Sequence, residues 1–178
     1  MDCSNINPFE VAVFLKTENF PIKEEYRIID AIWESRESFL SVQYCTNKKI
    51  FKKAVSHELN KLDGMLKDIA EINMILIEIG SKHRIDGSTF EHDVVASYFK
   101  VIKLRLVFAP GREYCRVKLR TIISSFGYKR RSLELVSTMN QVIGSLGLKT
   151  YLRGRESCEI GSVLLDKVIS IRLEQPIV

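Results

Sequence analysis

Three consecutive basic residues lie in the segment FGYKRRSLE, between a glycine and the start of an expected helix. They are Lys129, Arg130 and Arg131, and they precede Ser132, whose hydroxyl can accept a hydrogen bond from an unpaired N–H at a helix start. Such N–H groups and the helix dipole favour an anion, and cationic side chains beside them would strengthen the attraction for a phosphate of a duplex. These residues predict a phosphate-binding turn, against the alternative of a solvated turn that only improves solubility.

The positive charge of the chain is concentrated in its C-terminal third. Residues 1–109 contain 15 Lys and Arg against 16 Asp and Glu, whereas residues 110–178 contain 12 against 6. The net charge of +5 therefore comes from the region that holds the basic turn. A regional excess of positive charge favours a phosphate-bearing partner.

Two short amphipathic helices are expected to hold the basic turn between them. In residues 116–126 the apolar side chains recur at i, i+3, i+4 and i+7, and Gly127 stands where a left-handed helix cap is expected. A second helix begins after Ser132 as its N-cap. Its expected buried stripe consists of Leu135, Met139, Val142 and Leu146.

The polar residues Ser137, Asn140 and Gln141 fall on the outward side of this second helix. Amide side chains can form two hydrogen bonds with adenine, and a serine hydroxyl can adapt to several bases. The outward side is therefore suited to reading base edges. The alternative interpretation is an ordinary solvated helix surface.

After the second helix, residues 148–152 and 169–173 predict two strands, joined by a loop that contains Arg153 and Arg155. Helix, turn, helix, strand, loop and strand is the order of a winged helix, and residues 95–174 resemble the winged helix-turn-helix superfamily. The resemblance implies that the helix from Ser132 to Leu146 lies in the major groove, and that the two loop arginines contact the DNA backbone from the wing, Arg153 to Ser162. The turn GYKRRS is longer and more basic than a minimal linker of this motif.

The chain is expected to have an α+β fold with two parts. Residues 1–85 form a mainly helical region for dimerisation or partner binding, and residues 95–178 form a winged-helix domain with a small antiparallel sheet. A turn-like Asp86-Gly87-Ser88 separates the two parts. In the second part, alternation from Ile102 to Phe108 predicts an additional strand that ends at Pro110-Gly111.

Three elements are expected in the N-terminal part. Residues 7–20 begin with Asn-Pro and are ambiguous between a helix and a strand, and residues 22–45 predict one amphipathic helix. A longer helix from Lys49 to Gly80 repeats apolar residues in a heptad rhythm with Asn73 on the seam. This pattern predicts a homodimer through the helix around Val55–Leu76, against the alternative of a helix in an ordinary bundle, which a glycine in mid-helix favours.

The sequence holds none of the common catalytic motifs. His57-Glu58 lacks the second histidine of HExxH, and no GxxxxGK[ST], GxGxxG or GxSxG occurs, so we expect neither an enzyme nor a cofactor. His83 and His92 are interpreted as parts of an acidic surface loop rather than as metal ligands. The four cysteines form no CxxC pair and are expected to be reduced and structural.

A cytoplasmic protein that binds double-stranded DNA is the leading hypothesis, as a transcriptional regulator or as an accessory factor of a mobile-element or defence locus. No apolar stretch approaches the roughly 20 residues of a membrane span, and the N-terminus does not resemble a signal peptide. The first alternative is a protein-interaction adaptor that uses its winged helix to bind a protein. The second is a nucleic-acid-processing enzyme, although Asp30, Glu34 and Glu37 fit the polar side of a helix.

Overall fold

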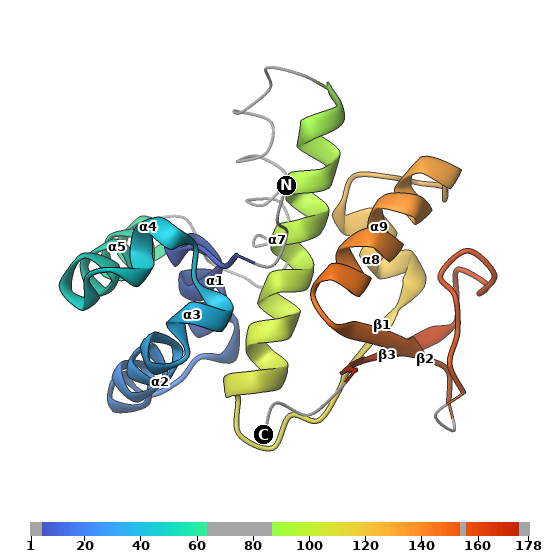
Figure 1. Cartoon of the computed structure of the whole chain (residues 1–178). Coiled ribbons are helices and arrows are strands. Elements are labelled where there is room, and N and C mark those ends of the chain that lie inside the picture. The colour runs from blue at the N-terminus through green and yellow to red at the C-terminus, as the bar shows by residue number, and fades with distance from the viewer. Residues whose placement is uncertain (1–4, 64–86, 154–155, 175–178) are drawn as a thin grey trace.

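The computed structural model of the chain describes residues 5–63, 87–153 and 156–174 (Figure 1). Helices make up the N-terminal part and a three-stranded antiparallel sheet lies in the C-terminal part, which confirms the predicted α+β class. In chain order the elements are α1 (Pro8–Glu18), α2 (Ile22–Glu34), α3 (Arg36–Phe39), α4 (Val42–Cys45), α5 (Lys48–Asp63), α7 (Gly87–Phe108), β1 (Cys115–Lys118), α8 (Leu119–Ser125), α9 (Leu133–Ser145), β2 (Leu148–Tyr151) and β3 (Val168–Leu173).

Helix α7 lies between two hydrophobic cores, with the N-terminal helices on one side and α8, α9 and the sheet on the other (Figure 1). Val101 and Leu104 belong to the N-terminal core. Phe99, Ile102 and Leu106 belong to the C-terminal core. One helix therefore supplies apolar side chains to both cores.

The predicted strand between Ile102 and Phe108 is wrong, because these residues form the last two turns of α7. A helix that is buried on one side shows a single apolar stripe, whereas a helix buried on two sides places apolar residues around its axis. In α7 the residues at 101, 102, 104 and 106 are all buried. The apparent period of two therefore comes from burial against two cores. The chain turns only after the end of α7 at Phe108, and Gly111 in this turn adopts a φ of 71°.

Helix α1 is the centre of the N-terminal core, which resolves the ambiguity of residues 7–20 in favour of a helix. Pro8 is its first residue, where the missing N–H of proline costs nothing. Its five consecutive buried apolar residues pack against α5 and α7, so they again form no single stripe. They are Val11, Ala12, Val13, Phe14 and Leu15.

Residues 22–45 form three helices instead of the single helix that their spacing predicts. Helix α2 ends at Glu34, and after α3 the chain becomes extended at Leu40. The extended segment pairs with Ile6, whose N–H donates to the Phe39 carbonyl at 2.7 Å and whose carbonyl accepts from Ser41 N at 3.1 Å. This pairing uses backbone groups that a continuous helix would need, so the helix is interrupted.

Helix α5 covers the first half of the segment in which the sequence predicts a heptad-like helix. Its positions Val55 and Leu62 are buried, and Leu59 packs beside them against the same core as α1. These three side chains are therefore covered by the chain itself, as the bundle interpretation expects. The later heptad positions, including Asn73 and Leu76, lie outside the described residues, and dimerisation stays a prediction.

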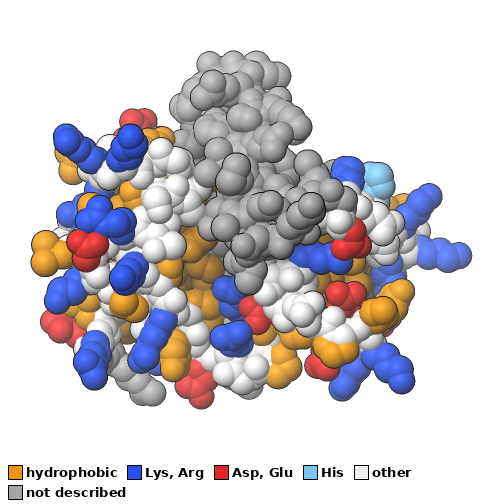
Figure 2. Space-filling view, turned by 180° about the vertical axis from the view of Figure 1, so that it is seen from behind, with side chains coloured by type: hydrophobic (Ala, Val, Ile, Leu, Met, Phe, Trp, Pro, Cys, Tyr) orange, Lys and Arg blue, Asp and Glu red, His pale blue; other side chains and the backbone are white. Residues whose placement is uncertain are grey.

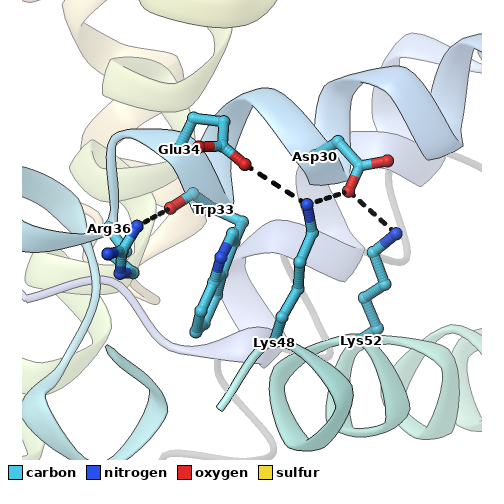
Figure 3. A network of polar contacts seen from close by, with 6 residues as sticks. All are labelled: Asp30, Trp33, Glu34, Arg36, Lys48 and Lys52. Carbon is cyan, nitrogen blue, oxygen red and sulfur yellow. Dashed lines mark hydrogen bonds and ion pairs between the residues drawn. The ribbon is translucent and has the colours of Figure 1, made fainter. Parts of the chain in front are cut away.

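A group of ion pairs joins α2 to α5 (Figure 3). Asp30 Oδ1 lies 2.8 Å from both Lys48 Nζ and Lys52 Nζ, and Glu34 Oε1 lies 3.3 Å from Lys48 Nζ. Hydrogen bonds from the two lysines hold the pKa of Asp30 below its ordinary value of 3.8. Asp30 and Glu34 are thus paired with lysines of the neighbouring helix, which agrees with their interpretation as the polar side of a helix.

Replacing Asp30 by asparagine is expected to reduce the free energy of unfolding at pH 7 by about 0.5–1 kcal/mol, because solvent screens this half-exposed group. Since the folded pKa lies below 3.8, the carboxylate stabilises the protein above that pH and loses its contribution as the pH falls through the folded pKa. Urea unfolding of both proteins from pH 7 to pH 2.5 measures this. Asp30→Asn should cost less as the pH falls, and a constant difference would contradict the assignment.

Candidate nucleic-acid interface

The sheet in the C-terminal part has the order β1-β3-β2, with both pairs antiparallel. Its inner face contributes Leu148, Ile169 and Ile171 to the core that α7, α8 and α9 cover. Strand β1 was not predicted, because residues 116–118 were expected to belong to a helix. The helix begins only at Leu119, because Arg116 and Lys118 pair with Ser170 and Val168 of β3.

Helices α8 and α9 hold the basic turn as the sequence predicts. Gly127 adopts a φ of 82°, a left-handed conformation that favours glycine. The Ser132 hydroxyl accepts a hydrogen bond from Leu135 N at 3.1 Å, which confirms it as the N-cap of α9. Both predicted apolar stripes are buried, namely Leu119, Ile122, Ile123 and Phe126 of the first segment and Leu135, Met139, Val142 and Leu146 of the second.

The three basic residues of the turn have different surroundings. Lys129 and Arg130 are exposed, and neither has a carboxylate partner among the described residues. Arg131 is half-buried, and its Nη1 donates to the carbonyls of Ile160 and Val163, both at 2.6 Å. Two cations are therefore available to an external anion, while the third binds the connection between β2 and β3.

Arg131 brings this connection against the two helices. Gly161 of the connection lies against Val136 of α9, since a Cβ added to this glycine would be 3.4 Å from Val136 Cγ1. On α8, Arg120 forms two hydrogen bonds with Asp166, at 2.7 and 2.9 Å. The basic turn and the connection that follows β2 are thus neighbours.

The outward side of α9 is polar and accessible. Ser137, Asn140 and Gln141 are exposed and share one side of the helix with Gly144, at spacings of three and four residues. A Cβ added to Gly144 would meet nothing within 4 Å. Glu134 is the single charged residue of α9, so little negative charge opposes an approaching phosphate backbone.

The structure describes one of the two arginines that were predicted in the wing. Arg153 is exposed and lines a hollow on the outer face of the sheet together with Arg116 and Arg172. Arg155 lies outside the described residues. Arg116 and Arg172 were not predicted as site residues, although the alternation of Arg172 with buried Ile171 indicates that its side chain faces outward.

Lys and Arg side chains are spread over the C-terminal part of the molecule on the face that Figure 2 shows, on the left of that view. Among the described residues, no three His, Cys, Asp or Glu side chains gather closely enough to hold a metal ion. Burial raises the pKa of the thiols of Cys115 and Cys158, which favours their protonated form. No described helix has both the length and the apolar character to cross a membrane.

Replacing Arg131 by methionine is expected to lower the free energy of unfolding by about 2 kcal/mol, because it removes two charge-assisted hydrogen bonds and leaves two carbonyls without this donor. The matched change Arg130→Met, at an exposed neighbour, should cost about 0.5 kcal/mol or less. Urea unfolding of both variants measures the difference. Equal stability of the two variants would contradict a structural role for Arg131.

The described residues thus bring together an exposed polar helix side, two unpaired cations at its start and a connection fixed beside it. No protein-family model, no curated protein and no solved structure matches the chain.

Proposed function

We propose that the protein binds double-stranded DNA with α9 in the major groove, and that it acts as a transcriptional regulator or an accessory DNA-binding factor. The order of α8, turn, α9, β2, connection and β3 supports the proposal, since it is the order of a winged helix. In that superfamily the second helix of the pair commonly enters the major groove.

The exposed polar side chains on the outward side of α9 are the main support for the proposal. A major groove about 12 Å wide accepts an α-helix whose exposed side chains are short enough to let it approach the bases. Ser137, Asn140 and Gln141 meet this condition, and the amides of Asn140 and Gln141 offer both a donor and an acceptor to base edges. Gly144 lies on the same side of α9 and adds no side chain that would keep the helix away from the bases.

Lys129 and Arg130 would bind phosphates at the start of α9. The N–H groups of a helix N-terminus and its dipole attract an anion, and two unpaired cations beside it add to that attraction. Phosphate contacts give affinity and orientation, whereas sequence preference has to come from the α9 side chains or from DNA shape. Arg131 fixes the connection beside these groups and contributes by positioning.

A titration of a fluorescent duplex with the full chain at two salt concentrations tests the proposal. The duplex comes from the neighbourhood of the gene, and a duplex of scrambled sequence serves as the reference. Binding should weaken as salt rises, because phosphate contacts release counterions, and the native duplex should bind more tightly than the scrambled one. Absence of binding to either duplex at low salt would refute the proposal.

A homodimer, which the heptad pattern from Val55 to Leu76 predicts, and a cytoplasmic location complete the proposal. A dimer would present two α9 helices to two half-sites about one helical turn of DNA apart. The mass of the protein in solution tests this directly. A monomer at the concentrations that bind DNA would limit recognition to a single site.

Two exposed leucines favour a protein partner as the second candidate function. Leu133, the first residue of α9, is 91% exposed, and Leu164 of the β2–β3 connection is 69% exposed. Exposed apolar side chains beside a basic turn would fit an acidic protein surface with an apolar centre. A Leu133→Ser variant that keeps full DNA affinity but loses a protein partner would favour the adaptor.

A further inference from the structure

The outer face of the sheet carries a hollow of about 520 Å³. Successive side chains of a strand point to opposite faces, and Ile169 and Ile171 of β3 are buried toward the helices. Val168, Ser170 and Arg172, which line the hollow, therefore point the other way. The hollow lies on the opposite face of the sheet from the helices and is separate from the proposed DNA interface.

Ser170 lines the hollow from β3, the middle strand of the sheet. In the strand register it lies opposite Arg116 of β1 on one side and opposite Tyr151 of β2 on the other. A guanidinium, a hydroxyl and a phenol ring thus form one row across all three strands. Arg172 follows two residues after Ser170 on the same face, and Arg153 lines the hollow where β2 ends.

The part of the hollow that the structure describes is lined by three arginines and no acidic side chain. Neither Arg116 nor Arg172 has a carboxylate partner in the described part of the chain. Arg172 Nε is shielded from solvent and has no hydrogen-bond acceptor among the described residues. A buried N–H without an acceptor is costly, so this cluster would gain from an anion supplied by a ligand.

The ring of Tyr114 contacts two of these guanidinium groups. The Arg116 Cζ lies 5.0 Å and the Arg172 Cζ 4.8 Å from the centroid of its ring. Stacking against the electron-rich ring face limits the orientations of both groups and offsets part of their mutual repulsion. The guanidinium groups of Arg116 and Arg172 are therefore oriented before any ligand binds.

We propose that this hollow binds a nucleoside phosphate, with the phosphate on the arginines and the base against Tyr151. Guanidinium groups bind phosphate oxygens through paired hydrogen bonds, and the Ser170 hydroxyl can add another. A planar base can stack on a tyrosine ring, and Leu152 and Val168 supply apolar surface beside it. The volume lies in the range of about 300–1,000 Å³ that small-molecule sites occupy.

A free nucleotide and the 5′-phosphorylated end of a nucleic-acid strand share this chemistry. The site does not depend on duplex binding by α9, because the two lie on different faces. Isothermal titration of the full chain with AMP should give saturable binding, while adenosine should bind at least about tenfold more weakly because it lacks the charged acceptor.

Arg116→Gln combined with Arg153→Gln is expected to weaken AMP binding by about a hundredfold, at roughly tenfold for each lost charge-assisted partner. Arg27→Gln, the same change at an exposed position of α2, is the control and should bind like the wild type. Both positions changed in the test variant are exposed, so the variant should fold, and a circular dichroism spectrum checks this.

The source of the phosphate is decided by comparing AMP with a 5′-phosphorylated tetranucleotide and with the same tetranucleotide bearing a 5′-hydroxyl. Tighter binding of AMP assigns the site to a free nucleotide, and tighter binding of the phosphorylated tetranucleotide assigns it to a strand end. No binding of either phosphorylated probe would overturn the proposal. Equal affinity of the wild type and the double variant would also overturn it.

Discussion

Replacing Glu10 by alanine is expected to lower the free energy of unfolding by about 3–5 kcal/mol, because it leaves a buried charge without its partner. Glu10 is 3% exposed and Lys100 is 8% exposed. Glu10 Oε1 lies 3.6 Å from Lys100 Nζ and accepts a hydrogen bond from Ser97 Oγ at 3.0 Å. Its Oε2 accepts from the backbone N–H of Asn7 at 2.7 Å, so one carboxylate serves both α7 and the start of α1.

Urea unfolding at pH 7 measures this loss, with Glu37→Ala at an exposed position of α3 as the control, expected to change stability by about 0.5 kcal/mol or less. A double variant, Glu10→Gln with Lys100→Met, removes both charges. It should be more stable than Glu10→Ala, since no unpaired charge then remains in the interface. A loss of less than about 1 kcal/mol for Glu10→Ala would show that the carboxylate does not hold α1 and α7 together.

Replacing Lys129 and Arg130 together by alanine is expected to weaken duplex binding by about ten- to a hundredfold near 0.1 M salt. The plot of log affinity against log salt concentration should lose about two units of slope, at roughly 0.9 for each phosphate contact. Because phosphate contacts carry no sequence information, the native and scrambled duplexes should lose affinity equally.

Two matched variants separate this effect from other causes. Lys23→Ala combined with Arg27→Ala removes the same charge from an exposed part of α2 and should leave the salt dependence unchanged. Asn140→Ala combined with Gln141→Ala should reduce the preference for the native duplex and keep the slope. An unchanged slope in the Lys129 and Arg130 variant would place the phosphate contacts elsewhere.

The two helices around the basic turn were predictable because each buries one side and exposes the other. Their apolar residues repeat at three and four residues, and glycine and serine mark the ends through local backbone chemistry at Gly127 and Ser132. Signals of this kind depend on neighbouring residues only. They are present in the sequence whatever the rest of the fold does.

Helix α7 could not be identified from the same kind of signal. Its period is set by two cores that lie on different sides of it, and one core is built from residues far earlier in the chain. The interruption near Leu40 likewise depends on pairing with Ile6, a partner 34 residues away. Long-range contacts of this kind override the local pattern.

The candidate site was only partly predictable for the same reason. The exposure of Lys129, Arg130, Asn140 and Gln141 follows from helix geometry and turn position. Arg131 donates hydrogen bonds to carbonyls 29 and 32 residues later in the chain, in the connection between β2 and β3. No sequence motif predicts these bonds. The cluster on the outer sheet face depends on strand β1, which the sequence analysis did not identify.

A site-specific photo-crosslink tests most directly whether α9 contacts DNA. Gln141 and, as a control, the exposed Tyr26 of α2 are each replaced by p-benzoyl-phenylalanine, and the complexes with a labelled duplex are irradiated. The proposed interface predicts a crosslink from position 141 that excess unlabelled duplex removes, and none from position 26. Crosslinking from position 26 alone, in a complex that still forms, would contradict it.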